Sequence, residues 1–283
     1  MRARLAAIPC LLAACTYEPS GEIALDAAGC ARASQSYQID RVELPRTPAA
    51  ATAAALDLDG DGSGDNQLGL LHAAIVAVSA RWDVGPALTA HLAAGHLRWA
   101  VRTDRCARGP GPLTVELARA EDADGDGVLE LLAPGAPAMD PTPVSADDLR
   151  ARGGVAEVPL GFLTDGAGDD GVALWVSGRA FAVDLTRAVD DTLTGRVAFA
   201  LGPLPDAALA PLARYATSAL SDPAVGAAWR AQDRDHDGTI SVAELRVLVD
   251  ALVRADLDLE GADGAADHLS AAIVIHATPV ASE

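Results

Sequence analysis

Apolar and polar residues alternate along several segments in the middle of the chain. In these segments every second residue is large and apolar, which is the period of a strand with one buried face. The four clearest segments contain Leu97, Trp99 and Val101; Leu113, Val115 and Leu117; Phe181, Val183 and Leu185; and Val197, Phe199 and Leu201. Residues 37–44 and 271–277 are also strand-like. The alternation therefore predicts a body that is mostly antiparallel sheet.

Other segments have the period of a helix. Apolar residues at helical spacing predict a helix from residue 68, at Leu68, Leu71, Ile75 and Val78. Further helices are expected over residues 86–94, 206–220, 223–232 and 242–255. Asp222 and Pro223 favour the start of the fourth helix, as a cap and a first-turn proline. The predicted fold class is α+β: an antiparallel sheet body with accessory helices and a C-terminal helix-loop-helix.

Loops rich in Asp and Gly interrupt these elements. They cover residues 57–65, 122–130, 233–244 and 256–267, and the second lies where two strands would be joined by a hairpin connection. An Ala-rich stretch, residues 47–55, precedes the first loop. Residues 133–143 are rich in Pro, and we expect them to form an exposed loop, as we do for residues 164–171.

The third acidic loop has an oxygen donor at each position that a twelve-residue calcium loop requires. Its expected ligands are Asp233, Asp235, Asp237, Thr239 through its carbonyl, Ser241 through a water, and Glu244 through both oxygens. Gly238 allows the sharp turn, and Ile240 would fix the loop to the core. The segment resembles the calmodulin-type EF-hand loop, which implies Ca²⁺ as the bound ion. The alternative is an acidic turn between helices that binds nothing.

Helices on both sides of the loop are part of the same resemblance. Val225 and Trp229 share a face before the loop, and an apolar stripe follows it at Leu245, Leu248, Val249 and Leu252. Dockerins also bind partners through calcium loops, but they carry two tandem copies of their loop-helix unit, and this chain does not.

Two other acidic loops fit a shorter, nine-residue pattern. The matching residues are Asp57, Asp59, Asp61, Gly62 and Asp65 in one loop, and Asp122, Asp124, Asp126, Gly127 and Glu130 in the other. The pattern resembles the calcium loops of integrin-type propeller repeats, which join strands. Leu68 and Ala133 stand at the twelfth places, so the bidentate acid of an EF-hand is missing from both loops. Solvated Asp-Gly turns are the alternative.

The last acidic loop is a degenerate candidate. Asp256, Asp258, Glu260 and Asp267 occupy places 1, 3, 5 and 12 of the EF-hand pattern, with Gly261 at place 6. However, Asp263 stands at the usually apolar eighth place, and a strand rather than a helix is expected next. EF-hands usually work in pairs, so this loop is a possible partner of the third one.

The first fifteen residues have the character of an export signal. Arg2 and Arg4 precede a short apolar run, which is too short to span a bilayer. Residues 12–15, Leu-Ala-Ala-Cys, resemble the bacterial lipobox, which implies that Cys15 is lipidated and anchors the mature chain. The alternative is an ordinary secretory signal. Both export the chain, with the outer membrane or cell surface as the expected location and the inner membrane or periplasm as alternatives.

Lipidation at Cys15 and loss of Cys10 would leave two cysteines, Cys30 and Cys106. In an oxidising compartment these two are expected to form a disulfide. Two unpaired, buried thiols are the alternative.

Composition and charge limit the classes of function that the chain could have. The 283 residues are 50% hydrophobic, enough for a core, and carry a formal net charge of -19 with Arg as the basic residue throughout. A nucleic-acid partner is excluded because phosphate backbones are bound through cationic contacts. The six His show no zinc-like spacing, and no nucleophile elbow, phosphate-binding loop or dinucleotide motif is present. We therefore expect no enzymatic activity.

These observations divide the chain into a signal peptide (1–14), a tether (15–26), an α+β body with two acidic loops (27–220), an EF-hand (221–255), and a degenerate acidic loop with a C-terminal strand (256–283). The expected function is that of a calcium-binding exported lipoprotein with a structural or adhesive role in the cell envelope. A calcium-dependent module that binds a protein or glycan is the alternative, and a hydrolase of unrecognised type is a third candidate.

Overall fold

The structure is a computed structural model that describes residues 32–78, 80, 83–106, 113–122, 124–125, 129–132, 137–140, 147–164, 171–202, 206–223, 226–252, 255–257, 259 and 266–280. Its strands are β1 (Arg32–Glu43), β2 (Trp99–Cys106), β3 (Leu113–Glu121), β4 (Glu130–Leu131), β5 (Ala138–Asp140), β6 (Asp148–Gly153), β7 (Ala156–Thr164), β8 (Gly171–Arg187), β9 (Leu193–Leu201) and β10 (Leu269–Pro279). The α-helices are α1 (Pro48–Ala54), α2 (Gln67–Val78), α3 (Gly85–Ala93), α4 (Asp206–Ser218), α5 (Gly226–Arg230) and α6 (Val242–Leu252), and a 3-10 turn, η3 (Ala219–Ser221), follows α4.

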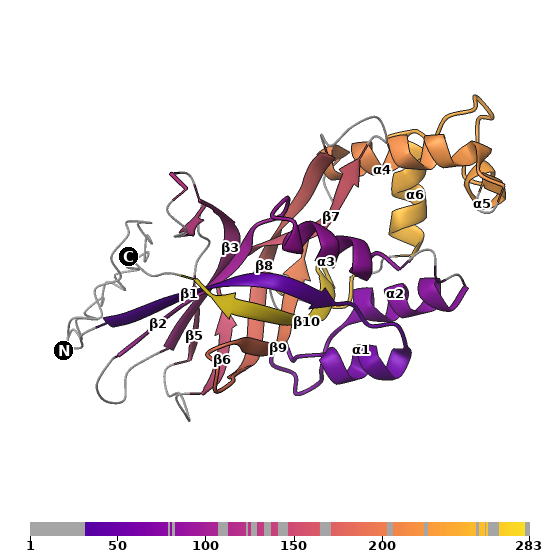
Figure 1. Cartoon of the computed structure of the whole chain (residues 1–283). Helices are drawn as coiled ribbons and strands as arrows, with labels where there is room; N and C mark the ends of the chain where they lie inside the picture. Colours follow the sequence, from indigo (N-terminus) through magenta and orange to yellow (C-terminus); the bar gives the residue numbers. More distant parts are fainter. Residues whose placement is uncertain are drawn as a thin grey trace, which may run out of the picture.

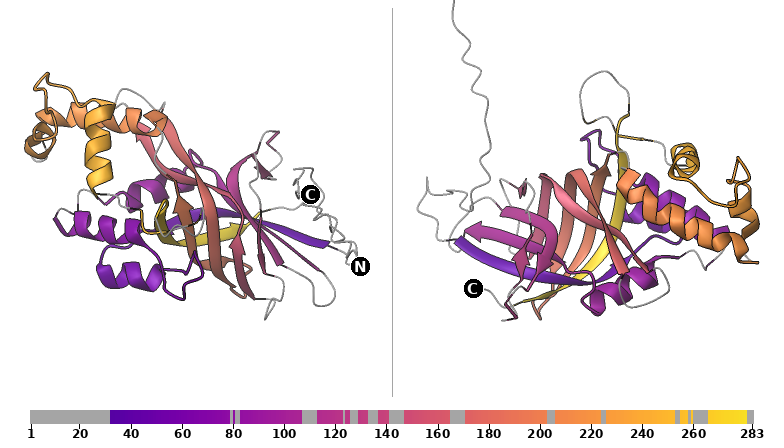
Figure 2. Two further views of the ribbon diagram at one scale, coloured as in Figure 1. Left: turned by 180° about the vertical axis from the view of Figure 1, so that it is seen from behind. Right: turned by 90° about the horizontal axis from the view of Figure 1, so that it is seen from above.

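The strands form one antiparallel sheet of ten strands in the order β2-β1-β10-β9-β8-β6-β5-β3-β4, with β7 paired to β8. An additional pairing of β2 with β3 joins two distant members of this order, so the strongly curved sheet closes on itself (Figures 1 and 2). The last strand, β10, lies between β1 and β9. The C-terminal strand is therefore built into the same sheet as the first strand of the body.

The core lies on the inner face of this curved sheet. Its largest side chains, Trp99, Tyr37, Phe181 and Phe199, are at most 1% exposed. The rings of Trp99 and Phe199 have their centroids 5.9 Å apart, and the indole N–H donates to the carbonyl of Glu157 at 2.9 Å. The period-two pattern correctly predicted that these strands turn their large apolar residues to the core. The expectation of a single buried face was wrong for β3, because the first six residues of this strand are all buried.

Small side chains of the sheet and one leucine from each of two acidic loops form an apolar cluster on the outer face. Ala182, Ala198, Ala200 and Ala272 form a cluster there with Leu58 and Leu257. Next to this cluster, the buried amide of Asn66 accepts from the N–H of Ala272 at 2.7 Å and donates to its carbonyl at 3.1 Å. Asn66 thus takes the place of a strand partner along β10, and it holds the loop that precedes α2 against the sheet.

The antiparallel sheet and the short helices confirm the coarse fold prediction. The sequence analysis missed four elements, namely α1, β5, β6 and β7. The side chain of Thr47 caps α1 by accepting from the N–H of Ala50 at 3.1 Å, and Pro48 begins the helix, so a start signal was present in the sequence. The prediction of an exposed loop over residues 133–143 was wrong for β5, because Ala138 is fully buried and its strand pairs with β3.

Among the residues that the structure describes, none of the helices combines the length and the apolar character needed to cross a membrane.

Candidate metal centres

The structure brings carboxylates together in two groups. Asp233, Asp235 and Asp237 form one group, and Asp57, Asp59 and Asp61 form the other. In each group the nearest carboxylate oxygens lie within 4.8 Å of one another. Sequence spacing predicted both groups, and the folded chain brings the carboxylates of each group together.

Hydrogen bonds from its own backbone shape the loop at residues 233–244. The carboxylate of Asp233 accepts from the N–H of Asp237 at 3.1 Å and from the N–H of Gly238 at 3.0 Å. Asp235 accepts from Asp237 at 3.2 Å, and Asp237 accepts from the N–H of Thr239 at 2.8 Å. His236 and Gly238 have positive φ of 60° and 83°, so the chain turns sharply between its three aspartates. The carboxylates therefore converge while the backbone wraps around them.

Glu244 folds back over the start of the loop from the first turn of α6. One carboxylate oxygen accepts from the N–H of Arg234 at 2.6 Å, and the other accepts from the N–H of Ser241 at 2.9 Å and its hydroxyl at 2.8 Å. The N–H of Ser241, the N–H of Arg234 and the Ser241 hydroxyl together lower the pKa of Glu244 to about 2. This acid is thus ionised at neutral pH, and from the twelfth position, where an EF-hand has its bidentate ligand, it reaches back to the N–H of the second loop residue.

Apolar contacts with α4 hold the loop in place. Ile240, at the eighth position, is 3% exposed and packs with Leu209, Ala213 and Leu245, and Trp229, Leu248 and Val249 surround this cluster. The N–H of Ile240 donates to the hydroxyl of Thr217 at 2.8 Å. The expected apolar stripe after the loop is confirmed for Leu245, Leu248 and Val249. Thr217 was missed, because nothing in its local sequence connects it to a loop 23 residues away.

The helices on the two sides of this loop differ in length. The segment before the loop is only α5, Gly226–Arg230, whereas α6 after it spans Val242–Leu252. A Cβ on Gly226 would lie 2.3 Å from the carbonyl oxygen of Leu220, so the start of α5 requires a glycine to approach η3 this closely. Arg230 also donates to the Leu220 carbonyl, at 2.6 Å. Together α4, α5 and α6 form a helical unit at one end of the sheet (Figure 1).

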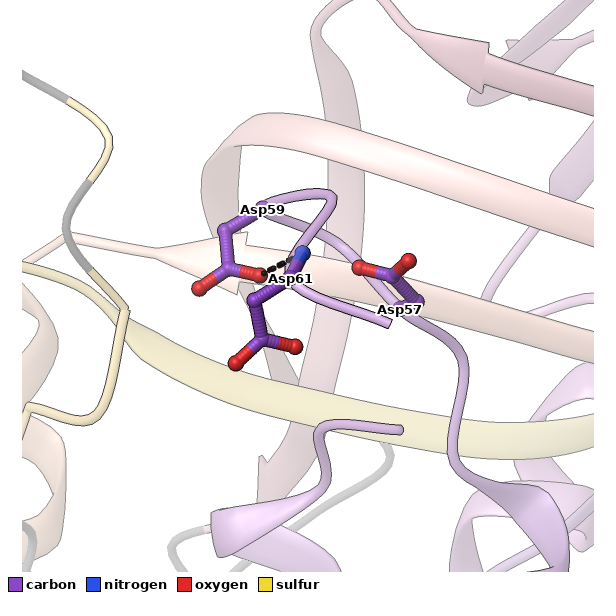
Figure 3. Close-up of side chains that lie close together, drawn as sticks. All are labelled: Asp57, Asp59 and Asp61. Carbon is purple, nitrogen blue, oxygen red and sulfur yellow. Dashed lines mark hydrogen bonds between the residues drawn. The ribbon is translucent and has the colours of Figure 1, made fainter. Parts of the chain in front are cut away.

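The loop at residues 57–65 repeats most of this backbone arrangement. Asp57 accepts from the N–H groups of Gly60 and Gly62, at 2.6 and 3.3 Å. Asp59 accepts from Asp61 at 3.1 Å, the bond that is dashed in Figure 3, and Asp61 accepts from Ser63 at 2.6 Å. Gly60 and Gly62 both have φ of 89°, so positions 4 and 6 are left-handed here as they are in the C-terminal loop.

The closing acid of this first loop comes from a different position. Asp65, the ninth residue, accepts from the N–H of Leu58 at 3.0 Å. Leu58 is the second residue of its loop, as Arg234 is of the other, so Asp65 occupies the role that Glu244 has there. Burial and the negative charges of Asp59 and Asp256 raise the pKa of Asp65, and they outweigh the hydrogen bond from Leu58, which lowers it. A cation in the loop would relieve this repulsion.

The first loop joins two helices, α1 and α2. The likeness to propeller repeats implied a loop between strands, and the structure corrects this point. The loop ends are drawn together by an antiparallel bridge between Leu56 and Asp65. Because helices flank it on both sides, the first loop resembles the C-terminal loop more than its sequence pattern indicated.

The other two acidic loops are described only in part. Within residues 122–130, Asp126 and Gly127 lie outside the described residues, while Asp122 lies 4.0 Å from the guanidinium of Arg98. Glu130 begins β4 and is paired with Glu121, and Asp124 lies in the bend before it.

In the last loop, Asp258, Glu260, Gly261 and Asp263 are also outside the described residues. The carboxylate of Asp256 accepts from the N–H of Ser270 at 2.7 Å, and Asp267 accepts from the N–H of Leu259 at 3.1 Å. The predicted lipidation site, Cys15, and Cys30 lie outside the described residues, as does the side chain of Cys106.

Comparison with known proteins adds one finding to this geometry. Residues 230–249 match the family model described as EF hand. No curated protein and no solved structure matches the chain. The matched segment begins at the last residue of α5 and ends inside α6, so it contains the whole loop with its three aspartates and Glu244. The chain therefore contains an EF-hand motif, and its loop has the donor groups for a calcium ion.

Proposed function

We propose that this chain is an exported lipoprotein that binds Ca²⁺ in the loop at residues 233–244, where the ion stabilises the helical unit α4–α5–α6. In this proposal α5, the loop and α6 form the helix-loop-helix of an EF-hand. The observation that carries the proposal is the convergence of Asp233, Asp235 and Asp237 to within 4.8 Å, with Glu244 folded back onto the N–H of Arg234 in the same loop.

The donor set favours calcium over other metals. All the side chains that converge in the loop offer oxygen, which hard cations prefer, and a bidentate Glu at the twelfth place suits the high coordination number of Ca²⁺. Mg²⁺ demands a tighter octahedron and gives up its waters reluctantly. Zn²⁺ and Cu²⁺ prefer nitrogen or sulfur ligands, and in the part of the chain described by the structure this loop presents neither toward its carboxylates.

Calcium would act here as a brace. Without an ion, the three aspartates and Glu244 crowd negative charge at one end of the apolar cluster around Ile240. An ion would neutralise that charge and tie the start of the loop to α6. If free calcium exceeded the dissociation constant a hundredfold, the folded state would gain about 2.7 kcal/mol.

The loop at residues 57–65 is a second calcium site in this proposal. Its support is the hydrogen-bond pattern it shares with the C-terminal loop and the position of Asp65 as a closing acid. The residues at 122–130 and 256–267 are retained as further candidate ligands.

A calcium-dependent binding module is the second candidate function, and one observation favours it. A hollow of about 490 Å³ lies beside the first loop, on strands β5, β6, β8 and β9. Asp57 lines it and lies 3.3 Å from the guanidinium of Arg152, and Arg150 and Arg196 flank Asp184 on the same surface. A protein or glycan partner could dock on this polar surface when calcium orders the loop.

The location of the protein is part of the proposal. Lipid on Cys15 would hold the mature chain at the outer membrane or cell surface, with residues 15–26 as a tether. In cells, Cys15→Ser should move the protein from the membrane fraction to the soluble fraction. A variant that still requires detergent for extraction would count against the lipid anchor.

Calcium binding itself is tested by calorimetry on chelator-treated protein. Glu244→Gln removes a charge and one strong ligand oxygen, and we expect calcium affinity at the C-terminal site to fall at least roughly tenfold. The matched control is Glu121→Gln, an exposed glutamate at the end of β3, which should bind as the wild type does. Equal affinities for all three proteins would show that this loop is not the calcium site.

A further inference from the structure

A pair of histidines lies outside both acidic loops. His91 is in the last turn of α3, and His96 follows the end of that helix. Their Nδ1 atoms are 3.2 Å apart, and their ring centroids are 5.5 Å apart with the planes inclined by 41°. Four residues separate them in sequence, a spacing that also occurs between the two His ligands of zinc fingers, and the fold brings the two imidazoles together.

The backbone between them explains why they meet. Gly95 has φ of 75°, and its N–H donates to the carbonyl of Leu92 at 3.0 Å, which ends α3 with a left-handed residue. The N–H of Leu97 then donates to the carbonyl of His91 at 3.2 Å, which brings the chain back beside the helix. Leu92 and Leu97 are both fully buried. The turn that carries the two rings is therefore anchored in the core on both sides.

We propose that His91 and His96 form a two-nitrogen chelating site for a late first-row transition-metal ion, such as Cu²⁺ or Zn²⁺. Imidazole nitrogens bind such ions at about 2.0–2.1 Å, and tetrahedral coordination then places two ligand nitrogens about 3.3–3.4 Å apart. The observed separation of 3.2 Å lies between this value and the roughly 2.8–3.0 Å that separates neighbouring nitrogens in a tetragonal Cu²⁺ site. Water would complete the coordination shell.

The site differs chemically from the calcium loops. Calcium takes oxygen ligands, whereas imidazole suits zinc, copper and nickel, with Cu²⁺ the tightest binder of the divalent series. Burial and the neighbouring His96 lower the pKa of His91, which favours the neutral, metal-binding form of this ring near pH 7. The guanidinium of Arg98 approaches this turn, with its Nε 3.9 Å from a Cβ built on Gly95. The net charge of -19 favours cations over the whole surface.

The test uses full-length, untagged, calcium-saturated protein titrated with Cu²⁺. Calorimetry measures affinity, and electron paramagnetic resonance reports the number of coordinated nitrogens. We expect a 1:1 site with two nitrogens in the wild type. The second ring binds intramolecularly, so His91→Ala or His96→Ala should each weaken affinity at least roughly tenfold and leave one nitrogen signal. His276→Gln is the matched control, because it removes a half-buried histidine on β10, outside this turn and outside both calcium loops.

Two results would overturn the proposal. One is wild-type copper affinity in the double variant His91→Ala/His96→Ala, which would assign the binding to other groups such as thiols. The other is a wild-type spectrum without nitrogen coordination. If the alanine variants unfold, His91→Gln and His96→Gln keep the bulk of the side chains without the imidazole, and the same tenfold loss is expected of them. The calcium proposal is unaffected by either result, because its readout is the Glu244→Gln variant.

Discussion

The loops at residues 57–65 and 233–244 lie in different parts of the molecule, yet they fold their first seven residues in nearly the same way. Each holds three aspartates at alternate positions, each has left-handed residues at positions 4 and 6, and each uses its third and fifth residues to accept from the backbone two residues further on. They differ at the eighth position and in the closing acid. A buried Ile240 joins the C-terminal loop to α4, whereas Gly64 stands at the same place in the first loop.

This difference separates two jobs of a calcium loop. The turn that gathers the aspartates depends on local hydrogen bonds from Asp side chains and on left-handed residues, so it forms in both loops although their surroundings differ. Attachment to the rest of the fold depends on what surrounds the loop. The C-terminal loop is attached through the packing of Ile240 and its hydrogen bond to Thr217. The first loop is attached through Leu58, which packs on the outer face of the sheet, and through Asn66, whose side chain is hydrogen-bonded to Ala272 of β10.

The largest effect is expected from breaking the attachment of the C-terminal loop. Ile240→Ala removes a side chain that is 3% exposed from the cluster on α4, and the resulting cavity should cost about 2–4 kcal/mol of unfolding free energy. Denaturant unfolding of calcium-saturated protein measures the loss. Val247→Ala is the control, because Val247 on α6 is 42% exposed and should cost little. Equal losses for the two variants would show that Ile240 does not anchor the loop.

A smaller and matched effect is expected at the sixth positions. Gly62→Ala and Gly238→Ala meet no atom within 4 Å, so each should lose only the strain of a side chain at φ of 89° or 83°. That strain is about 1–2 kcal/mol. Gly202→Ala, which has no positive φ and meets only ordinary contacts with His268, should be close to neutral in the same unfolding assay. A large loss at one glycine and none at the other would contradict the common geometry of the two loops.

Sequence reasoning predicted most of what is local. The grouping of Asp233, Asp235 and Asp237, the buried apolar residues of the long strands and the apolar stripe of α6 follow from short spacings, and the structure agrees. Elements whose apolar residues show no regular spacing were missed. The helix α1 is mostly Ala and has no apolar stripe, and β5 is a short strand within a Pro-rich segment.

Features that depend on the tertiary fold could not be predicted. Asp65 was recognised as a ligand candidate, but its role as a closing acid depends on the turn that brings it to the N–H of Leu58. The place of β10 between β1 and β9 and the bond from Ile240 to Thr217 likewise join residues whose relation no local pattern encodes.

The most direct measurement of the central claim is thermal unfolding of the purified chain over a calcium titration, with an EDTA-treated sample as the zero point. A brace at residues 233–244 predicts a melting temperature that rises with calcium and saturates, and a rise that Glu244→Gln shifts to higher calcium while Glu121→Gln leaves it unchanged. A melting temperature that is the same in EDTA and in saturating calcium would contradict the account.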